Sequence, residues 1–267
     1  MQETIAQALG LAMYGNAFLR GLDTGPFWPK ASFFGYCRSV RFLVAAAVGG
    51  DDAVAAADPA AWLRSLAGCG GLKVRTARRG PSAFADRMSV GFVDGGSIWL
   101  IEAAGGARPL SWSARWSIAD RSVEDGRIWS VEYHGLPAGP PSAPPDLDRA
   151  ERDLRESLEA IAGFAERIGS TFAGSFRSAL ACLDGATHRS RYHPDLAPSG
   201  LLSAQAQRIL AGCDSGWVFG GMGSWNDGAY GGEDEPAGDR LSQTLFDSLQ
   251  AALAGVASST AEAFADR

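Results

Sequence analysis

The stretch Leu110-Ser-Trp-Ser-Ala-Arg-Trp-Ser-Ile118 alternates apolar and polar residues with a period of two. This period is typical of a β-strand, in which successive side chains point to opposite faces of the sheet. Leu110, Trp112 and Trp116 share one face, whereas the serines and Arg115 share the other. A sheet that is covered on one side produces this partition. The stretch therefore predicts an antiparallel sheet with one tryptophan-rich buried face.

The same alternation continues on both sides of this strand. Asp94-Gly95-Gly96 lies between two of the alternating segments and suits a tight hairpin, because glycine accepts the positive φ that primed turns require. We expect an antiparallel meander of about five to seven strands. The strand segments are 39–47, 72–78, 87–93, 97–103, 110–118 and 127–135, with a further buried strand at 217–219.

Helical spacing dominates the two ends of the chain. The predicted helices cover residues 5–19, 59–67 with Asp58 as N-cap, 147–183 with Asp148 as N-cap, 203–211, and 239–256 with Asp239 as N-cap. We predict an α+β, two-layer fold in which the long helix and the C-terminal helix cover the aromatic face of the sheet. Residues 1–267 are expected to form a single domain, with a Pro-rich connection at 136–146 between the sheet-rich and helix-rich parts.

Charge and composition narrow the class of protein. The chain has 24 basic and 30 acidic residues, a net charge of -6 and a pI near 5.1. No overall positive field attracts nucleic acid or an anionic membrane, so we expect neither partner. Lys30 and Lys73 are its only lysines, and the preference for arginine, alanine and glycine is a bacterial-like composition bias. Individual arginines therefore carry less functional meaning than usual.

The sequence also predicts where the protein resides. Residues 1–20 carry Glu3 and lack a basic start, which is unlike a signal peptide, and no apolar run reaches the ~18 residues needed to span a bilayer. The four cysteines form no CxxC pair, which indicates buried free thiols rather than a zinc site or a disulfide framework. We expect a soluble cytoplasmic protein.

Common catalytic motifs are missing from the sequence. It contains no GxxxxGK[ST], HExxH or GxSxG pattern, no EF-hand loop and no kinase signature. The major motif-bearing enzyme classes are disfavoured, and we expect neither a cofactor nor a metal site.

The first candidate site is the loop that runs from His188 to Asp195. Its two imidazoles, on His188 and His193, could act as general acid or base, and Arg189 and Arg191 could bind an anion beside Tyr192. A solvated loop after a long helix explains the same residues.

The second candidate is the Gly-Trp loop, residues 220–228. Its glycines allow the backbone to approach a ligand, Trp225 and Asn226 offer stacking and hydrogen bonds, and Asp227 could orient a group. It is not a dinucleotide fingerprint, because no helix begins directly after the glycines. The alternative is a flexible loop whose tryptophan docks elsewhere on the protein.

Two clusters have simpler interpretations. The tryptophans at 99, 112, 116 and 129 fit a sheet core, with a stacking platform for a ligand as the alternative. The arginines at 75, 78, 79 and 87 fit a solvated edge strand rather than a nucleic-acid patch.

These observations lead to three functional hypotheses. The first is a non-catalytic binding protein that engages a protein partner or a small ligand through the loops 185–200 and 220–238. The second is an enzyme that acts on a small anionic substrate, with His188 or His193 as acid or base, Arg189 or Arg191 as anion clamp, and Asp227 as an orienting group. The third is a structural or assembly subunit. Both of the first two hypotheses require the two late loops to meet in one pocket.

Overall fold

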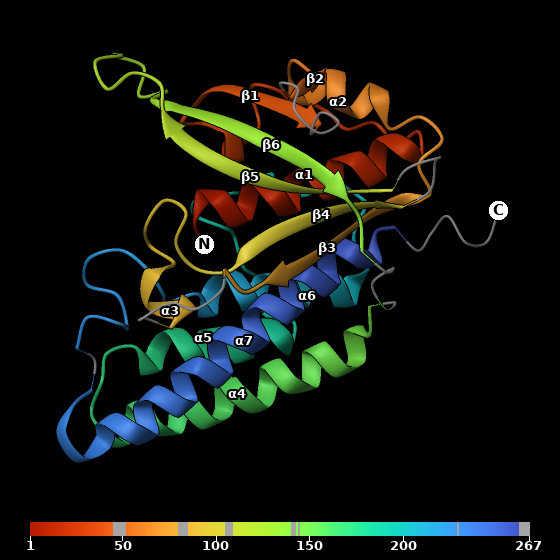
Figure 1. The fold of residues 1–267 in the computed structure, drawn as a ribbon. Helices are drawn as coiled ribbons and strands as arrows, with labels where there is room; N and C mark the ends of the chain where they lie inside the picture. The colour runs from red at the N-terminus through yellow and green to blue at the C-terminus, as the bar shows by residue number, and fades with distance from the viewer. Residues whose placement is uncertain are drawn as a thin grey trace.

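The computed structural model describes residues 1–44, 52–79, 85–104, 109–139, 143, 145–228 and 230–261. In this part the protein is an α+β structure with one six-stranded mixed sheet and seven α-helices (Figure 1). The strands are β1 (Cys37–Val44), β2 (Ala53–Ala56), β3 (Gly71–Ala77), β4 (Ile98–Ala104), β5 (Leu110–Ile118) and β6 (Trp129–Pro137). The helices are α1 (Glu3–Leu19), α2 (Pro59–Ser65), α3 (Asp86–Ser89), α4 (Leu147–Arg167), α5 (Ala173–Leu183), α6 (Ala204–Gly216) and α7 (Glu235–Ser259), with 3₁₀ turns η1 (Ser32–Phe34) and η2 (Gly232–Asp234). Parts of the predicted strand 39–47 and of the Pro-rich connection lie outside the described residues.

The sheet has the strand order β2-β1-β6-β5-β4-β3. Strands β4 to β6 are three of the predicted meander strands, and β3, at the further strand predicted for 72–78, pairs antiparallel with β4. Strand β1 pairs with β2 antiparallel. However, β1 pairs with β6 in parallel, from Cys37 opposite Trp129 to Val44 opposite Gly135. The sheet is therefore mixed, because a strand from the start of the chain is inserted beside the last strand of the meander. Period-two alternation identifies a strand but carries no information about the direction of its neighbour.

One predicted strand is wrong. Residues 87–93 form the short helix α3 and a turn rather than a strand, so no hairpin forms at 94–96. The side chain of Arg87 is buried and reaches Asp239 of α7, which anchors this segment to the helices instead of the sheet. The buried strand expected at 217–219 is also wrong, since these residues are an irregular segment after α6.

The aromatic face of the sheet is a packed core. Phe42 of β1 stacks between Trp62 of α2 at 4.5 Å and Tyr133 of β6 at 5.1 Å between ring centroids. Trp112 meets the same cluster edge-on, and Trp116 is also buried. Helix α1 packs on β3 and β4 and is buried along most of its length, so it is a central helix rather than an amphipathic surface helix. The interpretation of the meander tryptophans as sheet core is confirmed for Trp112 and Trp116.

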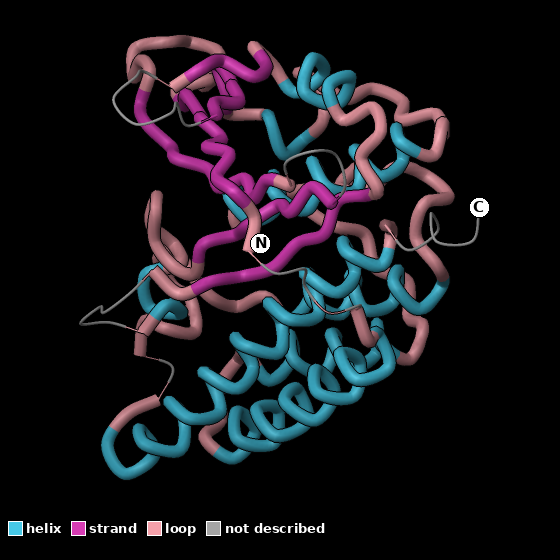
Figure 2. Tube along the Cα trace, turned by 45° about the vertical axis from the view of Figure 1, so that its right-hand side comes forward, coloured by secondary structure: helices cyan, strands magenta, loops and turns pink. Residues whose placement is uncertain are grey.

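Helices α4 to α7 gather in a layer below the strands, whereas α2 lies at the opposite end of the sheet, beside β1 and β2 (Figure 1 and Figure 2). The predicted long helix is two helices, α4 and α5, because the chain turns at Gly169, whose φ is +68°. Its N-cap is Asp146 rather than Asp148, and it accepts a hydrogen bond from Arg149 N at 2.8 Å. The main partners of α4 are α7 and α5, whereas α7 also packs on β3. The sheet is thus contacted mainly by α1, α2 and α7. We expected the long helix and the C-terminal helix to cover it, and of these two α7 packs on the sheet whereas α4 packs mainly on other helices.

The predicted starts of α2 and α6 agree with the structure, whereas that of α7 does not. Asp58 caps α2 as expected, accepting a hydrogen bond from Ala61 N at 2.7 Å, and Ser203 caps α6. Helix α7 starts at Glu235, so Asp239 lies inside the helix instead of capping it. Its carboxylate is used in a side-chain network described below.

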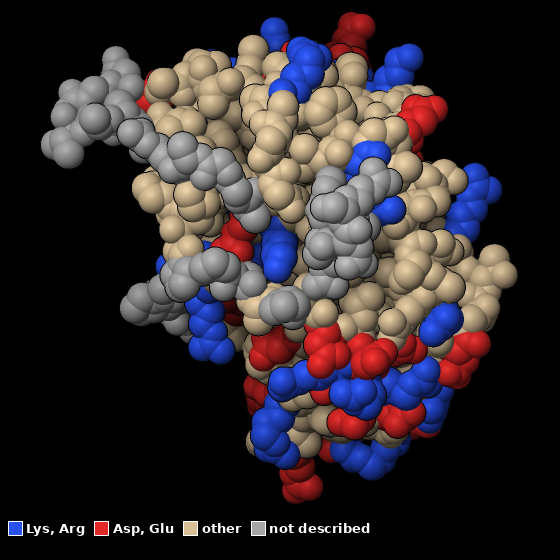
Figure 3. All heavy atoms as spheres, turned by 90° about the vertical axis from the view of Figure 1, so that its right-hand side faces the viewer, with Lys and Arg blue, Asp and Glu red and all other residues tan. Residues whose placement is uncertain are grey.

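Charges of both signs mix over the helical layer. Figure 3 shows acidic and basic side chains interleaved in the lower part of one face, at the level of α4 in Figure 1. Ion pairs within the helical part of the chain include Arg177–Glu166 at 2.7 Å and Arg155–Asp184 at 2.9 Å. In the described part of the chain, no helix combines the length and the apolar character needed to cross a bilayer.

Candidate functional site

The main hollow of functional interest is a cleft of about 620 Å³, which we call the aromatic cleft. Its size lies within the range of small-molecule sites. It opens where the start of α1, the ends of β5 and β6, the α4–α5 junction and the segment after α6 come together. Its lining residues are Met1–Thr4, Tyr36, Val90–Val93, Trp116, Trp129, Phe172, Ser175, Tyr192, His193, Ser215, Trp217–Gly220 and Met222–Ser224.

Two glycines allow the walls of the cleft to meet. A Cβ on Gly220 would lie 2.9 Å from the Cα of Gly91, and a Cβ on Gly91 would lie 2.7 Å from the N of Gly221. Gly220 also has a φ of +84°, which L-residues rarely adopt. Gln2 completes the junction, because its Nε2 donates to the carbonyl of Phe219 at 2.7 Å. Backbone from the sheet side and from the C-terminal half is thereby held in direct contact with the start of α1.

Both late loops contribute to this one cleft. Tyr192 and His193 come from the first candidate loop, and Gly220 and Met222–Ser224 come from the Gly-Trp loop. The shared pocket that the binding and enzyme hypotheses required is therefore present. However, the residues of the Gly-Trp loop that line the cleft all precede Trp225.

Trp225 and Asn226, which were predicted to bind a ligand, are structural. Trp225 is fully buried, packs edge-on against Phe176 at 5.2 Å between ring centroids, and donates its indole N–H to Ser242 Oγ at 2.6 Å. Asn226 donates its amide to the carbonyl of Arg87 at 2.6 Å and accepts from the Arg87 guanidinium at 3.1 Å. Neither residue lines the cleft.

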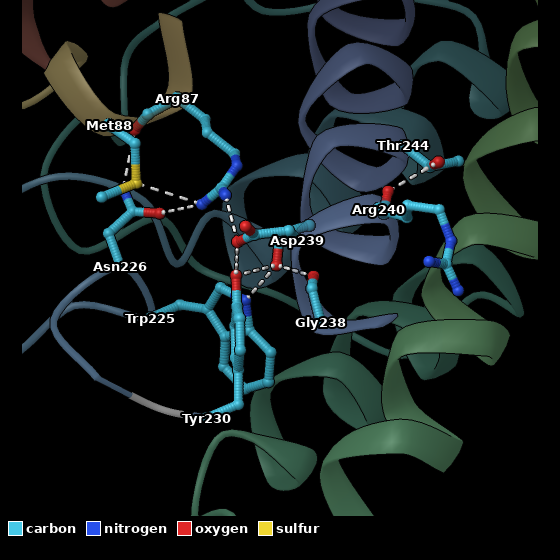
Figure 4. A network of polar contacts seen from close by, with 10 residues as sticks. Arg87, Met88, Trp225, Asn226, Tyr230, Gly238, Asp239, Arg240 and Thr244 are labelled. Atoms are coloured by element: carbon cyan, nitrogen blue, oxygen red, sulfur yellow. Dashed lines mark hydrogen bonds and ion pairs between the residues drawn. The ribbon is translucent and has the colours of Figure 1, made fainter. Parts of the chain in front are cut away.

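These two residues belong to a polar network that joins α3, the Gly-Trp loop and α7 (Figure 4). The Arg87 guanidinium reaches Asp239 Oδ1 at 2.6 Å, and Tyr230 donates to the same oxygen at 2.9 Å. A buried guanidinium requires such partners, because an unpaired buried charge is strongly unfavourable. Hence Arg87 was not a solvated edge residue, and the Gly-Trp loop is an anchored loop rather than a flexible one.

Asp227 also has a local role. Its carboxylate accepts hydrogen bonds from the backbone N–H groups of Gly223 and Ser224, at 2.7 and 3.2 Å. It does not line the cleft, although the turn that it stabilises does. Asp227 was expected to orient a bound group, but in this structure its carboxylate stabilises a turn.

Glu3 and His193 form the polar centre of the cleft. The Nε2 of His193 lies 4.0 Å from the Oε2 of Glu3, and the His193 side chain is almost fully buried. No described residue makes a satisfactory hydrogen bond to this Nε2. The Oε1 of Gln2, one residue from Glu3, is likewise buried without a partner. The indole N–H of Trp116, another cleft residue, is also buried without a partner. Buried polar atoms are nearly always hydrogen-bonded, so three unpaired atoms on cleft residues indicate a place where another molecule binds.

Burial shifts the pKa values of this pair in opposite directions, each in favour of the neutral form. It raises the pKa of the Glu3 carboxyl to about 7, against the opposing effect of the Met1 amino group. It lowers the pKa of His193, assisted by the same amino group, while Asp214, the Met1 backbone and Asp195 act in the opposite direction. A carboxyl whose pKa is raised by burial, close to an imidazole whose pKa is lowered by burial, is an arrangement suited to proton exchange.

Ser32, Asp195 and Tyr14 hold the loop that carries His193. Ser32 Oγ lies 3.5 Å from His193 Nδ1 and donates its own hydrogen to Asp195. The loop is held further by Tyr14, whose hydroxyl donates to the Asp195 carbonyl at 3.0 Å. Because the Ser32 hydrogen goes to Asp195, its lone pair accepts from the Nδ1–H of neutral His193. The cleft-side Nε2 is then left as an acceptor.

His188 lies in a neighbouring smaller hollow of about 340 Å³. Its Nε2 is 2.7 Å from Asp214 Oδ2 of α6, which forms a compact imidazole–carboxylate pair. His193 lines both hollows, so the two predicted histidines are close to one another but face different spaces.

The predicted anion clamp is not part of either hollow. Arg189 and Arg191 are exposed and absent from both linings. Among the described lining residues of the aromatic cleft there is no arginine or lysine. Within the described chain, no group of three or more metal-ligating side chains occurs either.

Exposed apolar side chains surround the entrance of the cleft. Tyr192 was predicted and is 64% exposed there, while Phe92, at 74%, was not predicted. Tyr36, Val93 and Met222 complete this group, which we call the apolar rim. Large exposed apolar groups that cluster around a hollow are typical of binding sites.

Sequence reasoning missed Gln2, Glu3 and the aromatic wall residues Phe172 and Trp217. Nothing in the local sequence around Glu3 distinguishes it from an ordinary acidic residue in the first turn of a helix. Comparison with known protein families, with curated proteins and with solved structures finds no match for this chain.

Proposed function

We propose that this protein is a non-catalytic binding protein that takes a small organic ligand in the aromatic cleft. The main support for this proposal is the cleft of about 620 Å³, in which buried polar atoms of Gln2 and His193 lack hydrogen-bond partners. Exposed apolar side chains form the rim of this cleft. An apolar cavity with a few convergent polar groups is the usual form of a ligand site. The rim supplies apolar contact area, and the floor supplies orientation.

A cleft-filling variant tests this proposal. Ser175 of α5 lines the cleft, whereas Ser178 on the same helix is exposed and does not line it. A panel of small aromatic compounds is screened by thermal shift on the wild type, Ser175→Trp and Ser178→Trp. We expect the compounds that stabilise the wild type to stabilise Ser178→Trp equally and to lose their effect on Ser175→Trp. Stabilisation that persists in Ser175→Trp contradicts the proposal.

A second candidate function is general acid–base catalysis on a small substrate in the same cleft. The specific observation is the pair Glu3–His193, 4.0 Å apart, with a carboxyl pKa of about 7 and an oriented imidazole. Such a pair can remove a proton from a bound substrate and return it to another position. In this version His193 keeps its predicted role as acid or base, Glu3 is its partner, and neither His188 nor Asp227 takes part.

This catalytic version has its own test. A metabolite mixture in D₂O is incubated with wild type and with His193→Gln, and exchange of carbon-bound hydrogen is followed by NMR. Exchange by the wild type that His193→Gln lacks supports catalysis. Binding without exchange in the wild type supports the non-catalytic function. A role as an assembly subunit is a separate hypothesis, which light scattering at high concentration tests.

A further inference from the structure

Three polar groups at the floor of the aromatic cleft accept hydrogen bonds: the side-chain oxygen of Gln2, Nε2 of His193 and the carboxyl of Glu3. Among the described lining residues, the buried indole N–H of Trp116 is an unpaired donor. From the three acceptors we infer that the cleft selects an organic ammonium ion, a protonated amine attached to an aromatic or alkyl body. The inference rests on the proposed binding function and specifies the class of its ligand.

The first acceptor is the side-chain oxygen of Gln2. The amide nitrogen of Gln2 donates to the carbonyl of Phe219 at 2.7 Å, which fixes the orientation of the amide. The opposite atom, Oε1, is therefore the acceptor, and it is buried without a donor among the described residues.

The second acceptor is Nε2 of His193, a residue that is 4% exposed. Ser32 donates its hydroxyl hydrogen to Asp195 and so can only accept from His193 Nδ1. A neutral imidazole that donates through Nδ1 has a lone pair on Nε2. This nitrogen also lacks a partner in the described chain.

The third acceptor is the Glu3 carboxyl group, 4.0 Å from His193 Nε2. No hydrogen-bond donor to its oxygens is found among the described residues. A primary ammonium group carries three N–H donors and a full positive charge, which matches three acceptors of which one can be an anion. An alcohol offers one donor, and a carboxylate offers none.

The walls of the cleft fit the same ligand. Trp116, Trp129 and Trp217, together with Tyr36 and Phe172, line it, and aromatic faces attract cations. No arginine or lysine occurs among the described lining residues. These walls therefore favour an organic cation over an organic anion.

The charged groups around Glu3 also favour a cation. Asp214 and Asp195 both act electrostatically on His193, and each is a carboxylate. The positive group in this region is the Met1 amino group, whose pKa is lowered by burial, with Asp214 and Glu3 acting in the opposite direction. Glu3, Asp195 and Asp214 thus place three carboxyl groups near His193, and a cationic ligand interacts favourably with such a cluster.

Three probes that share one ring test the inference by titration calorimetry on the full chain at pH 7.5. The probes are 2-phenylethylamine, which is cationic, 2-phenylethanol, which is neutral, and phenylacetate, which is anionic. We expect the amine to bind at least tenfold more tightly than the alcohol, and the acid to bind most weakly. Equal or tighter binding of the alcohol or the acid overturns the inference.

A matched pair of variants assigns the preference to Glu3. In Glu3→Gln we expect the amine to lose about tenfold in affinity and the alcohol to change by less than twofold. Glu156→Gln, at an exposed position of α4, is the control and leaves both affinities unchanged. An amine preference that survives in Glu3→Gln overturns the role of the carboxylate.

A pH series on the wild type gives an answer that does not depend on the folding of a variant. Glu3 has a pKa of about 7, so the amine must displace a proton from it at lower pH. Between pH 7.5 and pH 5.5 the amine affinity should fall about 20-fold, with proton release on binding, while the alcohol affinity stays level. An amine affinity that is independent of pH contradicts the inference.

The outcomes separate this inference from the proposed function. If another aromatic compound binds, and Ser175→Trp abolishes its binding, while 2-phenylethylamine shows no preference, the ammonium inference fails and the binding function stands. If Ser175→Trp leaves all binding intact, the binding function itself fails.

Discussion

The imidazole Nε2 of His193 lies 4.0 Å from the carboxyl Oε2 of Glu3, so the first turn of α1 and a loop from the C-terminal half of the chain meet at one point. This meeting converts an ordinary helix-start carboxylate and a loop histidine into an enclosed acid–base pair. The surrounding aromatic cleft and the apolar rim give the pair a space in which a ligand can lie.

The protonation of Glu3 should appear in the stability of the free protein. Its pKa is raised by burial from 4.5 to about 7, so the folded state holds a proton that the unfolded state has released between these values. The protein therefore loses stability as the pH rises from about 4.5 to about 7 through this group. In Glu3→Gln this loss is absent, and the variant should gain about 1–2 kcal/mol relative to wild type between pH 5 and pH 8. Urea unfolding at both pH values measures this difference, and an unchanged difference contradicts the raised pKa.

The contact between Gly91 and Gly220 should be sterically specific. Gly220→Ala places a methyl group 2.9 Å from the Gly91 Cα and still closer to the Gln2 Nε2, at a φ of +84°, whereas Gly221→Ala has a similar φ of +88° but open space around its Cβ. We expect Gly221→Ala to lose about 1 kcal/mol and Gly220→Ala about 2–4 kcal/mol of unfolding free energy. Equal losses in denaturant unfolding would show that the close approach is not required.

The ion pair between Arg87 and Asp239 should matter more than surface pairs of the same type. The Arg87 side chain is 7% exposed, so Asp239→Asn leaves a buried guanidinium with a neutral partner. We expect a loss of about 1–2 kcal/mol. Asp153→Asn removes the exposed pair with Arg149 and should change stability by less than about 0.5 kcal/mol. Similar values for both variants in thermal unfolding contradict the structural role of the network.

Two neighbouring residues of the first candidate loop should behave differently toward ligands. Tyr192 lines the cleft and Arg191 does not. For any ligand that Ser175→Trp excludes, Tyr192→Ala should weaken binding about three- to tenfold, and Arg191→Ala should change it by less than twofold. A larger effect of Arg191→Ala restores the anion-clamp hypothesis.

Most helices and strands could be predicted because the local periodicity of apolar residues indicates them. Leu110 to Ile118 is a strand as expected, and the start of α2 at Asp58 follows capping chemistry. The failures occur where distant contacts override the local pattern. Residues 87–93 alternate like a strand, but Arg87 is held by Asp239 and Asn226 and the segment turns instead. The parallel pairing of β1 with β6 depends on chain topology, which alternation does not record.

The candidate site was predicted in part for a similar reason. His193 and Tyr192 stand out because polar and aromatic groups cluster in one loop, and both line the cleft. Trp225 stands out too, because it lies among glycines and polar residues that are typical of an exposed loop. In the structure it is a core residue that contacts α4, α5 and α7. Gln2 and Glu3 carry no local motif, and only the folded chain brings them to His193.

The central claim is that ligands occupy the aromatic cleft, and the indole N–H signals of the tryptophans report on it directly. Two-dimensional ¹⁵N–¹H spectra of the labelled protein are recorded during titration with 2-phenylethylamine. The account predicts that the signals of Trp116, Trp129 and Trp217 move with one saturable dissociation constant, while those of Trp62, Trp112 and Trp225 stay in place. Shifts confined to the second group, or no saturable shift in the first group with any aromatic compound, would contradict it.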